Sequence, residues 1–358
     1  MGERMPGVVV VGSSFGSRVH VPAARAAGMD VVALVGRKRE RTERRAAKVG
    51  VETACTSLAE ALALPGSDIV IIATPPTTHA ELAEEVLAAG RHVLVEEPFT
   101  TDAAEAHRLS DAAHKAGVVA LVGHEFRFAP ARATLQHALK EGMVGEPRIA
   151  TFVGLTGFAA PLDLRMPEWW FDPARGGGWL GAAVSHFVDA IRVWLGEFES
   201  VSGALSVVSG RDPRTTAEDT AAFRFRMRSG CDGVLQHSAA VWGPGAHVNL
   251  VAGPRGTLAM QGDTVTFSDP AGTRTLDPAG PSLAAEVEPS TEPGHEFTHI
   301  ELNPAIVQAT VLREMVLDRP DPHPFVVPAT FTDGLRCMEV LDAVRRSAAE
   351  GGAVVTLP

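Results

Sequence analysis

The chain has 358 residues, of which 45% are hydrophobic and 21% are charged, and its formal net charge at pH 7 is −11. This length suffices for two domains with separate cores. The acidic balance excludes a general binder of nucleic acids or of anionic membranes, since both require a positive surface. The sequence has no apolar run of the roughly 18 residues that a membrane-spanning helix needs.

Cysteine and tyrosine usage narrow the chemistry. Cys55, Cys231 and Cys337 are far apart and form no CxxC pair, which indicates packing residues in a reducing cytoplasm and no metal site. Any mechanism that needs a tyrosine acid is excluded, because the sequence has no tyrosine. Residues Met1 to Gly7 are expected to lead into a strand and not to form a signal peptide. A cytoplasmic protein is therefore predicted.

The first third of the chain alternates short apolar runs with helical patterns. We predict strands over 8–11, 31–35, 68–73, 92–95 and 118–122, and helices after the turn at 12–17 and over 37–48, 79–89 and 103–116. This alternation indicates βαβ units around a parallel sheet. The predicted fold class is α/β, with an N-terminal doubly wound parallel sheet of the Rossmann type over residues 1–124.

The pattern changes after about residue 147. Longer segments with alternating polarity follow at 149–155, 201–208, 220–228, 233–241 and 247–252. They predict a C-terminal α+β domain over 125–358 with an open, mainly antiparallel sheet. We also predict a helix over 183–195, a long loop over 268–296 and helices from about residue 303. Whether these last helices pack back on the first domain is left open.

The first turn carries part of a dinucleotide fingerprint. The pattern G-x-G-x-x-G places glycines at the tight turn, at the closest approach to pyrophosphate and at helix packing. Gly12 fits the first position, whereas Ser14 and Ser17 occupy the second and third. The predicted cofactor contacts are Gly12, Ser14, Phe15 and Gly16, because main-chain N–H groups at a helix start bind an anion. The alternative is a small-residue turn without a ligand.

The end of the second strand bears on the choice of nucleotide. An acidic residue there favours NAD, whereas a nearby arginine accommodates the 2′-phosphate of NADP. The sequence has Gly36 followed by Arg37 and Lys38, so NADP is predicted and NAD is the alternative. These two cations could instead belong to a solvated helix face, the interpretation that we adopt for Arg41 to Arg45.

Three further segments extend the pattern over nearly the whole chain. They are residues 73–98 (ATPPTTHAELAEEVLAAGRHVLVEEP), 123–130 (GHEFRFAP) and 176–196 (GGGWLGAAVSHFVDAIRVWLG). Together with the first turn they resemble the Gfo/Idh/MocA family, named for glucose–fructose oxidoreductase and inositol dehydrogenase. The resemblance implies a nicotinamide cofactor and hydride transfer to or from a sugar, polyol or related carbonyl compound. It also implies a homodimer or homotetramer formed through the C-terminal sheet.

The resemblance assigns residues to the cofactor and reveals two departures. Thr74, Pro75, Pro76 and His79 would line the nicotinamide half, and Glu96 would lie beside the nicotinamide ribose. The family's E-K-P motif is Glu96-Glu97-Pro98 here, so the catalytic lysine is replaced by Glu97. The family also often has an aspartate four residues before its catalytic histidine, where this chain has Ala182.

The catalytic candidates are therefore His186 and Glu97. A histidine suits proton transfer near neutral pH, and a buried structural histidine is the alternative. Glu97 could serve as a general base if a pocket raises its pKa, or it could mark a site without redox chemistry, since a carboxylate opposes an alkoxide.

Four residues are predicted to bind substrate. Arg127 would bind an anionic group or support the cleft, with a structural ion pair as the alternative. Trp170, Asp172 and Arg175 lie in a segment with three tryptophans before the helix at 183–195 and would form a cleft wall for a ring-containing substrate. Aromatic residues that cover the core are the alternative.

Three functions remain open from the sequence. The first is an NADP(H)-dependent oxidoreductase with His186 as acid–base and Glu97 in a modified role. The second is a non-redox acid–base enzyme on the same scaffold, catalysing elimination, isomerisation or cyclisation. The third is a non-catalytic binding protein. The lost lysine weakens the first, whereas the retained cofactor-side residues and His186 weigh against the third.

Overall fold

A computed structural model describes residues 4–162, 166–210, 216–281 and 298–358. The chain forms two compact units, residues 1–128 with 281–335 and residues 129–280 with 336–358. The first unit is discontinuous because the segment 281–335 returns to it. The boundary that we predict between residues 124 and 125 stays a prediction about domain organisation.

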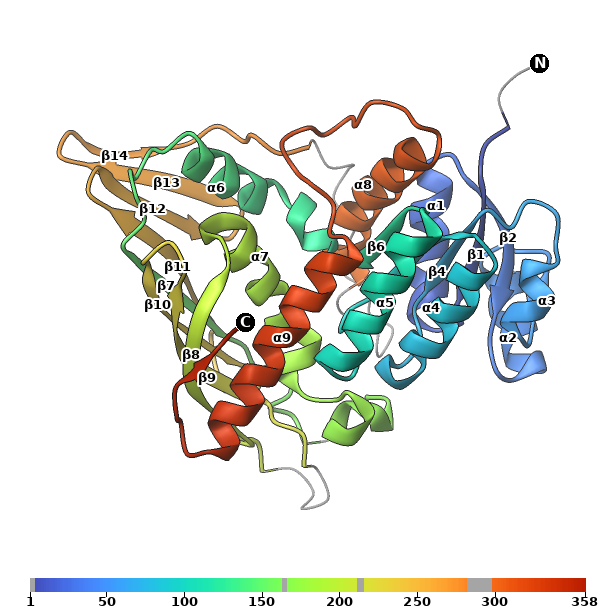
Figure 1. Cartoon of the computed structure of the whole chain (residues 1–358), viewed down its shortest axis with the longest axis horizontal. Helices are drawn as coiled ribbons and strands as arrows, with labels where there is room; N and C mark the ends of the chain where they lie inside the picture. The colour runs from blue at the N-terminus through green and yellow to red at the C-terminus, as the bar shows by residue number, and fades with distance from the viewer. Residues whose placement is uncertain (1–3, 163–165, 211–215, 282–297) are drawn as a thin grey trace. The chain divides into compact units, whose positions relative to one another are not determined.

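The first unit is built around six parallel strands in the order β3-β2-β1-β4-β5-β6 (Figure 1). The strands are β1 (Gly7–Val11), β2 (Asp30–Val35), β3 (Ala54–Cys55), β4 (Ile69–Ile72), β5 (His92–Glu96) and β6 (Ala120–Gly123). The helices are α1 (Val21–Ala26), α2 (Arg39–Lys48), α3 (Leu58–Leu62), α4 (His79–Ala88), α5 (Ala103–Ala116) and α8 (Thr298–Val316), with short helices η1 (Gly16–His20), η2 (Pro76–Thr78) and η3 (Glu125–Phe128). The predicted doubly wound parallel sheet is confirmed.

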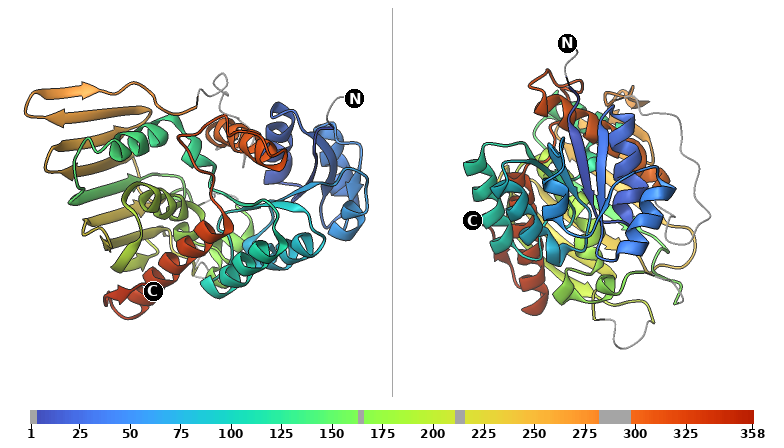
Figure 2. Two further views of the ribbon diagram at one scale, coloured as in Figure 1. Left: turned by 45° about the horizontal axis from the view of Figure 1, so that its top comes forward. Right: turned by 90° about the vertical axis from the view of Figure 1, so that its right-hand side faces the viewer.

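Buried apolar strands explain why this sheet forms. Residues of β1 and β4 are fully or almost fully buried, as the apolar runs predict for strands covered on both faces. Helices lie on both faces of the sheet, with α1 packed against α8 and α4 packed against α5 (Figure 2). The order of the strands reverses between β1 and β4, which is where sheets of this kind bind dinucleotides.

The second unit is built around a nine-stranded sheet in the order β14-β13-β12-β11-β7-β10-β9-β8-β15. Its strands are β7 (Ile149–Leu155), β8 (Phe198–Ser206), β9 (Thr220–Met227), β10 (Asp232–Ser238), β11 (Ala246–Gly253), β12 (Gly256–Gln261), β13 (Thr264–Asp269), β14 (Gly272–Thr275) and β15 (Val355–Thr356). Its helices are α6 (Pro130–Lys140), α7 (Ser185–Leu195) and most of α9 (Phe331–Ala349), with η4 (Glu168–Phe171), η5 (Pro173–Arg175) and η6 (Leu180–Val184). Among the strands of the described residues only β7 and β10 pair in parallel here, so the sheet is mainly antiparallel, as predicted.

The two faces of this sheet differ. Helices α6 and α7 pack against each other and lie over one face (Figure 2). On the other face Ile149, Val234 and Val248, from the neighbouring strands β7, β10 and β11, are about half exposed. These three apolar side chains therefore form an exposed group on one face of the sheet.

The structure corrects two sequence predictions. The loop predicted over 268–296 is wrong for residues 268–269 and 272–275, which belong to β13 and β14; all residues of β14 are exposed, so no apolar period marks them. Residues 282–297 of that loop lie outside the described residues. The helix predicted over 183–195 begins earlier, as the π-helical turn η6 that runs into α7.

Candidate functional site

The first βα turn brings the main chain against the end of β4. Gly12 has a φ of +119°, and a Cβ atom there would lie 2.0 Å from the carbonyl oxygen of Ala73. A Cβ atom on Gly16 would lie 2.7 Å from a methyl group of Val10. The turn therefore has the conformation and the close helix packing that a dinucleotide-binding turn requires. These residues fit a pyrophosphate group, which main-chain N–H groups of the turn would bind.

The serines in the two other glycine positions have different environments. Ser14 is exposed, so its hydroxyl is accessible to an anion. Ser17 is buried, and its Oγ donates to the carbonyl oxygens of Ser13 and Ser14 at 3.0 and 2.9 Å. Ser17 thus stabilises the turn from inside. Phe15 is half-buried, and the centroid of its ring lies 5.6 Å from that of the His20 ring, in an edge-to-face arrangement.

Cationic side chains gather at this turn. Arg37 and Lys38, between β2 and α2, are both exposed. Arg45 of α2 is half-buried, and its Nη1 donates to the carbonyl oxygen of Ser13 at 2.6 Å. The pKa of Arg45 is lowered first by burial and then by neighbouring guanidinium groups, those of Arg41, Arg18 and Arg44. The prediction of a merely solvated face is therefore wrong for Arg45, because its side chain reaches the glycine turn.

The turn after β4 contains the predicted contacts to the nicotinamide half. Thr74 and Pro75 are half-buried, and Pro76 is buried. His79 is fully buried, with Nε2 at 2.8 Å from the carbonyl oxygen of Thr74 and Nδ1 at 3.1 Å from that of Pro98. Burial lowers the pKa of His79. His79 thus joins the turns that follow β4 and β5, and only the neighbouring residues offer surface to a ligand.

The carboxyl end of β5 carries a pair that sequence reasoning missed. Oε1 of Glu96 lies 2.5 Å from Nε2 of His20 in η1, and both side chains are buried. The next residue, Glu97, is half-buried. Because His20 and Glu96 are 76 residues apart in the sequence, no local pattern could couple them.

A third acidic group joins this end of the sheet from α8. Glu301 lies in the first turn of α8, which packs against η1. Burial, followed by the negative charge of Glu96, raises the pKa of Glu301 to about 8; Glu97 adds to this effect and Arg18 opposes it. Glu301 therefore carries a proton at neutral pH beside two other carboxyl groups. The sequence offered no signal for it except an acidic residue early in a late helix.

In the second unit, His186 lies in the first turn of α7. His186 is 8% exposed. Its main-chain carbonyl oxygen accepts a hydrogen bond from Nη1 of Arg132 at 3.1 Å. Ala182, one turn earlier in η6, is half-buried and brings no carboxylate to that position. His186 is therefore the acid–base residue of the family motif that this unit retains.

The tryptophan-rich segment before α7 places its three predicted residues differently. Trp170 lines a pocket, together with Trp179. Asp172 accepts a hydrogen bond from the main-chain N–H of Ala174 at 3.0 Å and so caps η5. Arg175 is exposed, at 3.8 Å from Glu168. The prediction that Asp172 and Arg175 face a substrate thus has no support from their contacts, whereas Trp170 lies where a ligand could reach it.

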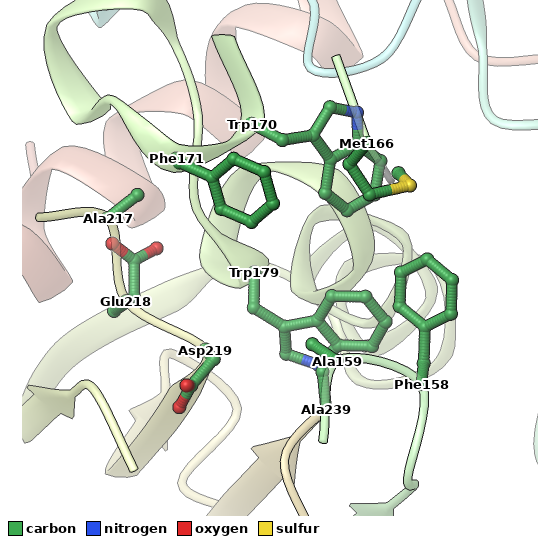
Figure 3. Close-up of a pocket in the computed structure, with 10 residues that line it drawn as sticks. All are labelled: Phe158, Ala159, Met166, Trp170, Phe171, Trp179, Ala217, Glu218, Asp219 and Ala239. Carbon is green, nitrogen blue, oxygen red and sulfur yellow. The ribbon is translucent and has the colours of Figure 1, made fainter. Parts of the chain in front are cut away.

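The pocket beside Trp170 is walled by aromatic rings and edged by carboxylates (Figure 3). Its lining includes Phe158, Trp170, Phe171, Trp179, Glu218 and Asp219. Nε1 of Trp179 donates to Nδ1 of His237 at 2.7 Å. Burial lowers the pKa of His237 to about 4, with smaller contributions from His247 and Arg132, so the imidazole is neutral and accepts this hydrogen bond.

Arg127 has the contacts of a structural residue. It is buried in η3, with Nη2 at 3.2 Å from Oδ1 of Asp333, and its Nη1 donates to the carbonyl oxygen of Val327 at 3.0 Å. The structural ion pair, which was the alternative at the sequence level, is the arrangement observed. Arg127 therefore fixes η3 to the segment that leads into α9.

The described ranges contain neither a metal-binding cluster nor a membrane-spanning helix. In residues 4–162, 166–210, 216–281 and 298–358, no group of three histidine, cysteine, aspartate or glutamate side chains is arranged to hold a metal ion. Over the same part of the chain, no helix combines the length and the apolar character needed to cross a membrane.

Comparison with known proteins agrees with this geometry. The family described as "Oxidoreductase family, NAD-binding Rossmann fold" (GFO_IDH_MocA) matches residues 7–124, and "GFO/IDH/MocA C-terminal domain" matches residues 133–259. A 1,5-anhydro-D-fructose reductase of Ensifer adhaerens is 30% identical over 258 residues, which cover 72% of this chain and 75% of the reductase.

Solved structures show the same fold. An oxidoreductase domain protein from Kribbella flavida is 27% identical, with a TM-score of 0.83 over 99% of this chain and 100% of that one. A levoglucosan dehydrogenase in complex with NADH and levoglucosan has a TM-score of 0.84 at 22% identity, covering 99% and 100% of the two chains. At that identity the likeness concerns the fold alone.

Proposed function

This chain belongs to the Gfo/Idh/MocA family of oxidoreductases, and from that premise we propose that it is an NADP(H)-dependent oxidoreductase with atypical acid–base residues. Its substrate is a sugar, a polyol or a related carbonyl compound. The related 1,5-anhydro-D-fructose reductase, which by its name acts on a sugar derivative, supports this substrate class.

The cations near the glycine turn are the observation that favours NADP over NAD. The residues after β2 are Gly36, Arg37 and Lys38, so no carboxylate stands at the strand end to bind a ribose 2′-hydroxyl. Arg45 reaches the same turn through its bond to Ser13, within electrostatic range of three other arginines. Such a positive site favours the additional phosphate of NADP over the hydroxyl of NAD.

Each group has a defined task in the proposed reaction. When bound, NADP(H) would supply or accept the hydride. The turn at Gly12 binds pyrophosphate, and Thr74 and Pro75 line the cofactor. His186 exchanges a proton with the substrate oxygen. Glu97 binds a substrate hydroxyl or accepts its proton, in place of the lysine of the family motif.

Calorimetry with NADPH and NADH tests the cofactor. NADPH should bind more tightly, and Arg37→Ala should reduce the difference because it removes an exposed cation without disturbing packing. Arg108→Ala, which removes an exposed cation from α5 of the same unit, is the matched control and should leave the preference unchanged. Equal or tighter binding of NADH by the unaltered protein would contradict the proposal.

Exchanges at Glu97 define its role. If Glu97 only replaces the lysine in a redox site, Glu97→Lys should preserve or raise turnover with a polyol or sugar, since a cation that stabilises a developing alkoxide is worth about 3 kcal/mol. If Glu97 is a base, Glu97→Lys should abolish activity and leave NADPH affinity nearly intact. Glu97→Gln should then slow the reaction strongly and remove one limb of the pH–rate profile. Unchanged kinetics in both variants would make Glu97 a bystander.

One observation favours a second candidate function. Glu97 replaces the motif lysine, and Glu96 and Glu301 add two more carboxyl groups nearby. Such a group of acids is better suited to proton transfer than to stabilisation of an alkoxide. A non-redox elimination, isomerisation or cyclisation on this scaffold is therefore the alternative. It predicts turnover without net change in the absorbance of NADPH, whereas a non-catalytic binding protein would show no turnover.

A further inference from the structure

The aromatic pocket of the second unit has walls suited to a cation. Rings of Phe158, Trp170 and Trp179 lie close together, with centroids 6.0 Å apart for Phe158 and Trp170 and 5.7 Å for Phe158 and Trp179. Trp170 and Trp179 are 6.4 Å apart, and all three rings border the pocket (Figure 3). The faces of such rings attract cations through their quadrupoles, most strongly in the case of tryptophan. The interior of the pocket is narrow and admits small groups only.

A carboxylate borders the same pocket and is held in place by the main chain. Oε1 of Glu218 accepts a hydrogen bond from the N–H of Leu180 at 3.0 Å, and the Glu218 carbonyl oxygen accepts one from the N–H of Trp179 at 2.8 Å. A Cβ atom at Gly178, which has a φ of +111°, would lie 2.2 Å from Oε1 and 2.6 Å from Oε2. The absence of a side chain at Gly178 thus makes room for the carboxylate of Glu218 at the border of the pocket.

The two neighbouring acids at this edge differ in how their charge is compensated. Asp219 accepts hydrogen bonds from the N–H groups of Val208 and Ser209 at 2.8 and 2.9 Å and from the hydroxyl of Thr220 at 3.0 Å. These bonds outweigh burial and lower the pKa of Asp219. Asp219 therefore stabilises a turn and needs no further partner.

Glu218 is less well compensated. Burial raises its pKa in spite of the bond from Leu180. Arg345, whose Nη1 donates to Asp342 at 2.8 Å, attracts the carboxylate electrostatically and opposes the effect of burial without cancelling it. A carboxylate of this kind gains most from a ligand that brings a positive charge.

We propose that this pocket binds the protonated amino group of the substrate, with Glu218 as the counter-charge and the rings of Trp170, Trp179 and Phe158 as the walls. The proposal rests on the proposed function in that it narrows the substrate to an amine-bearing sugar or polyol. A neutral hydroxyl group would gain little from the aromatic faces and would bring no positive charge to Glu218. The interior of the pocket is too narrow for a whole sugar ring, but it can accept the ammonium group of a larger molecule.

Binding of three probes without cofactor tests the pocket separately from hydride transfer. D-glucosamine, D-glucose and N-acetyl-D-glucosamine are titrated at pH 6.5 and constant ionic strength, by calorimetry and by the fluorescence of the pocket tryptophans. D-glucosamine should bind on the order of ten-fold more tightly than either neutral sugar, the size expected for a charge-assisted hydrogen bond. Equal binding of all three by the unaltered protein would overturn the proposal without the need for any variant.

Variants assign the effect to the pocket. Glu218→Gln keeps the acceptor for Leu180 and removes the charge, and Trp170→Leu keeps apolar bulk and removes a ring. Each should reduce the preference for D-glucosamine several-fold, whereas the exposed Glu141→Gln should not. If both pocket variants fold, as circular dichroism reports, and retain the full preference, the proposal is wrong. If the preference holds but NADPH-dependent turnover is absent with every sugar, the pocket stands and the proposed redox function fails.

Discussion

Replacement of Glu301 by glutamine should make the protein less sensitive to alkaline pH. The folded-state pKa of Glu301 is about 8, against an ordinary value of 4.5, because the carboxyl group is buried beside Glu96 and Glu97, with Arg18 as the opposing charge. Between these two values the folded protein holds a proton that the unfolded chain has released. Folding therefore takes up a proton, and stability falls as the pH rises through this window.

The size of the effect follows from the same two values. Each pH unit between the two pKa values corresponds to about 1.4 kcal/mol, so the complete window from 4.5 to about 8 corresponds to about 5 kcal/mol. Solvent relieves part of this cost, since the side chain is only partly buried by area. We therefore expect Glu301→Gln to gain on the order of 2 kcal/mol over the unaltered protein between pH 5 and pH 8.5.

Thermal unfolding at a series of pH values measures this gain. The midpoint of Glu301→Gln minus that of the unaltered protein should increase steadily from pH 5 to pH 8.5 and then level off. Glu81→Gln, an exposed glutamate of α4 in the same unit, should give a constant difference. Glu97→Gln should lower the upper end of the window, because it removes one of the charges that raise the folded-state pKa of Glu301. A difference between Glu301→Gln and the unaltered protein that is the same at every pH would refute the reasoning.

Three further predictions concern packing and assembly. Gly12→Ala forces a Cβ atom against the carbonyl oxygen of Ala73 and should lower both the unfolding midpoint and NADPH affinity; calorimetry that finds the affinity unchanged would contradict the role of the turn. Trp179→Phe leaves Nδ1 of His237 without its donor and should cost about 1–2 kcal/mol in urea unfolding, so an unchanged midpoint would count against this bond. The protein should form a dimer or tetramer through the apolar outer face of the second sheet, and light scattering should report the corresponding mass. Val234→Arg should reduce the mass of the assembly, whereas a monomeric unaltered protein would exclude that interface.

The sequence was informative where one physical cause dominates. Fully buried strands such as β1 and β4 have to be apolar at every position, so their positions could be predicted closely. The tight turn at Gly12 was recognisable because few residue types tolerate its conformation. The parallel and the mainly antiparallel sheet followed from the change in strand spacing near residue 147.

Features that depend on distant partners could not be predicted. Arg45 belongs to a charged run, and only the fold shows that its side chain crosses to Ser13. The pairing of Glu96 with His20 and the nearby position of Glu301 join segments from three regions of the chain. The strand β14 was missed because all four of its residues are exposed and polar or glycine, so they leave no apolar alternation to detect.

The discontinuity of the first unit has a consequence for synthesis on the ribosome. Ala305, Ala309 and Leu312 of α8 complete the apolar core around Val8 and Val21, and Gln308 donates to the carbonyl oxygen of Val122 in β6 at 2.8 Å. The first six strands therefore leave the ribosome long before the helix that covers them is made. Their apolar face stays open while the second unit is translated, so the nascent chain offers a binding surface to chaperones, and a fragment that ends at residue 128 should aggregate.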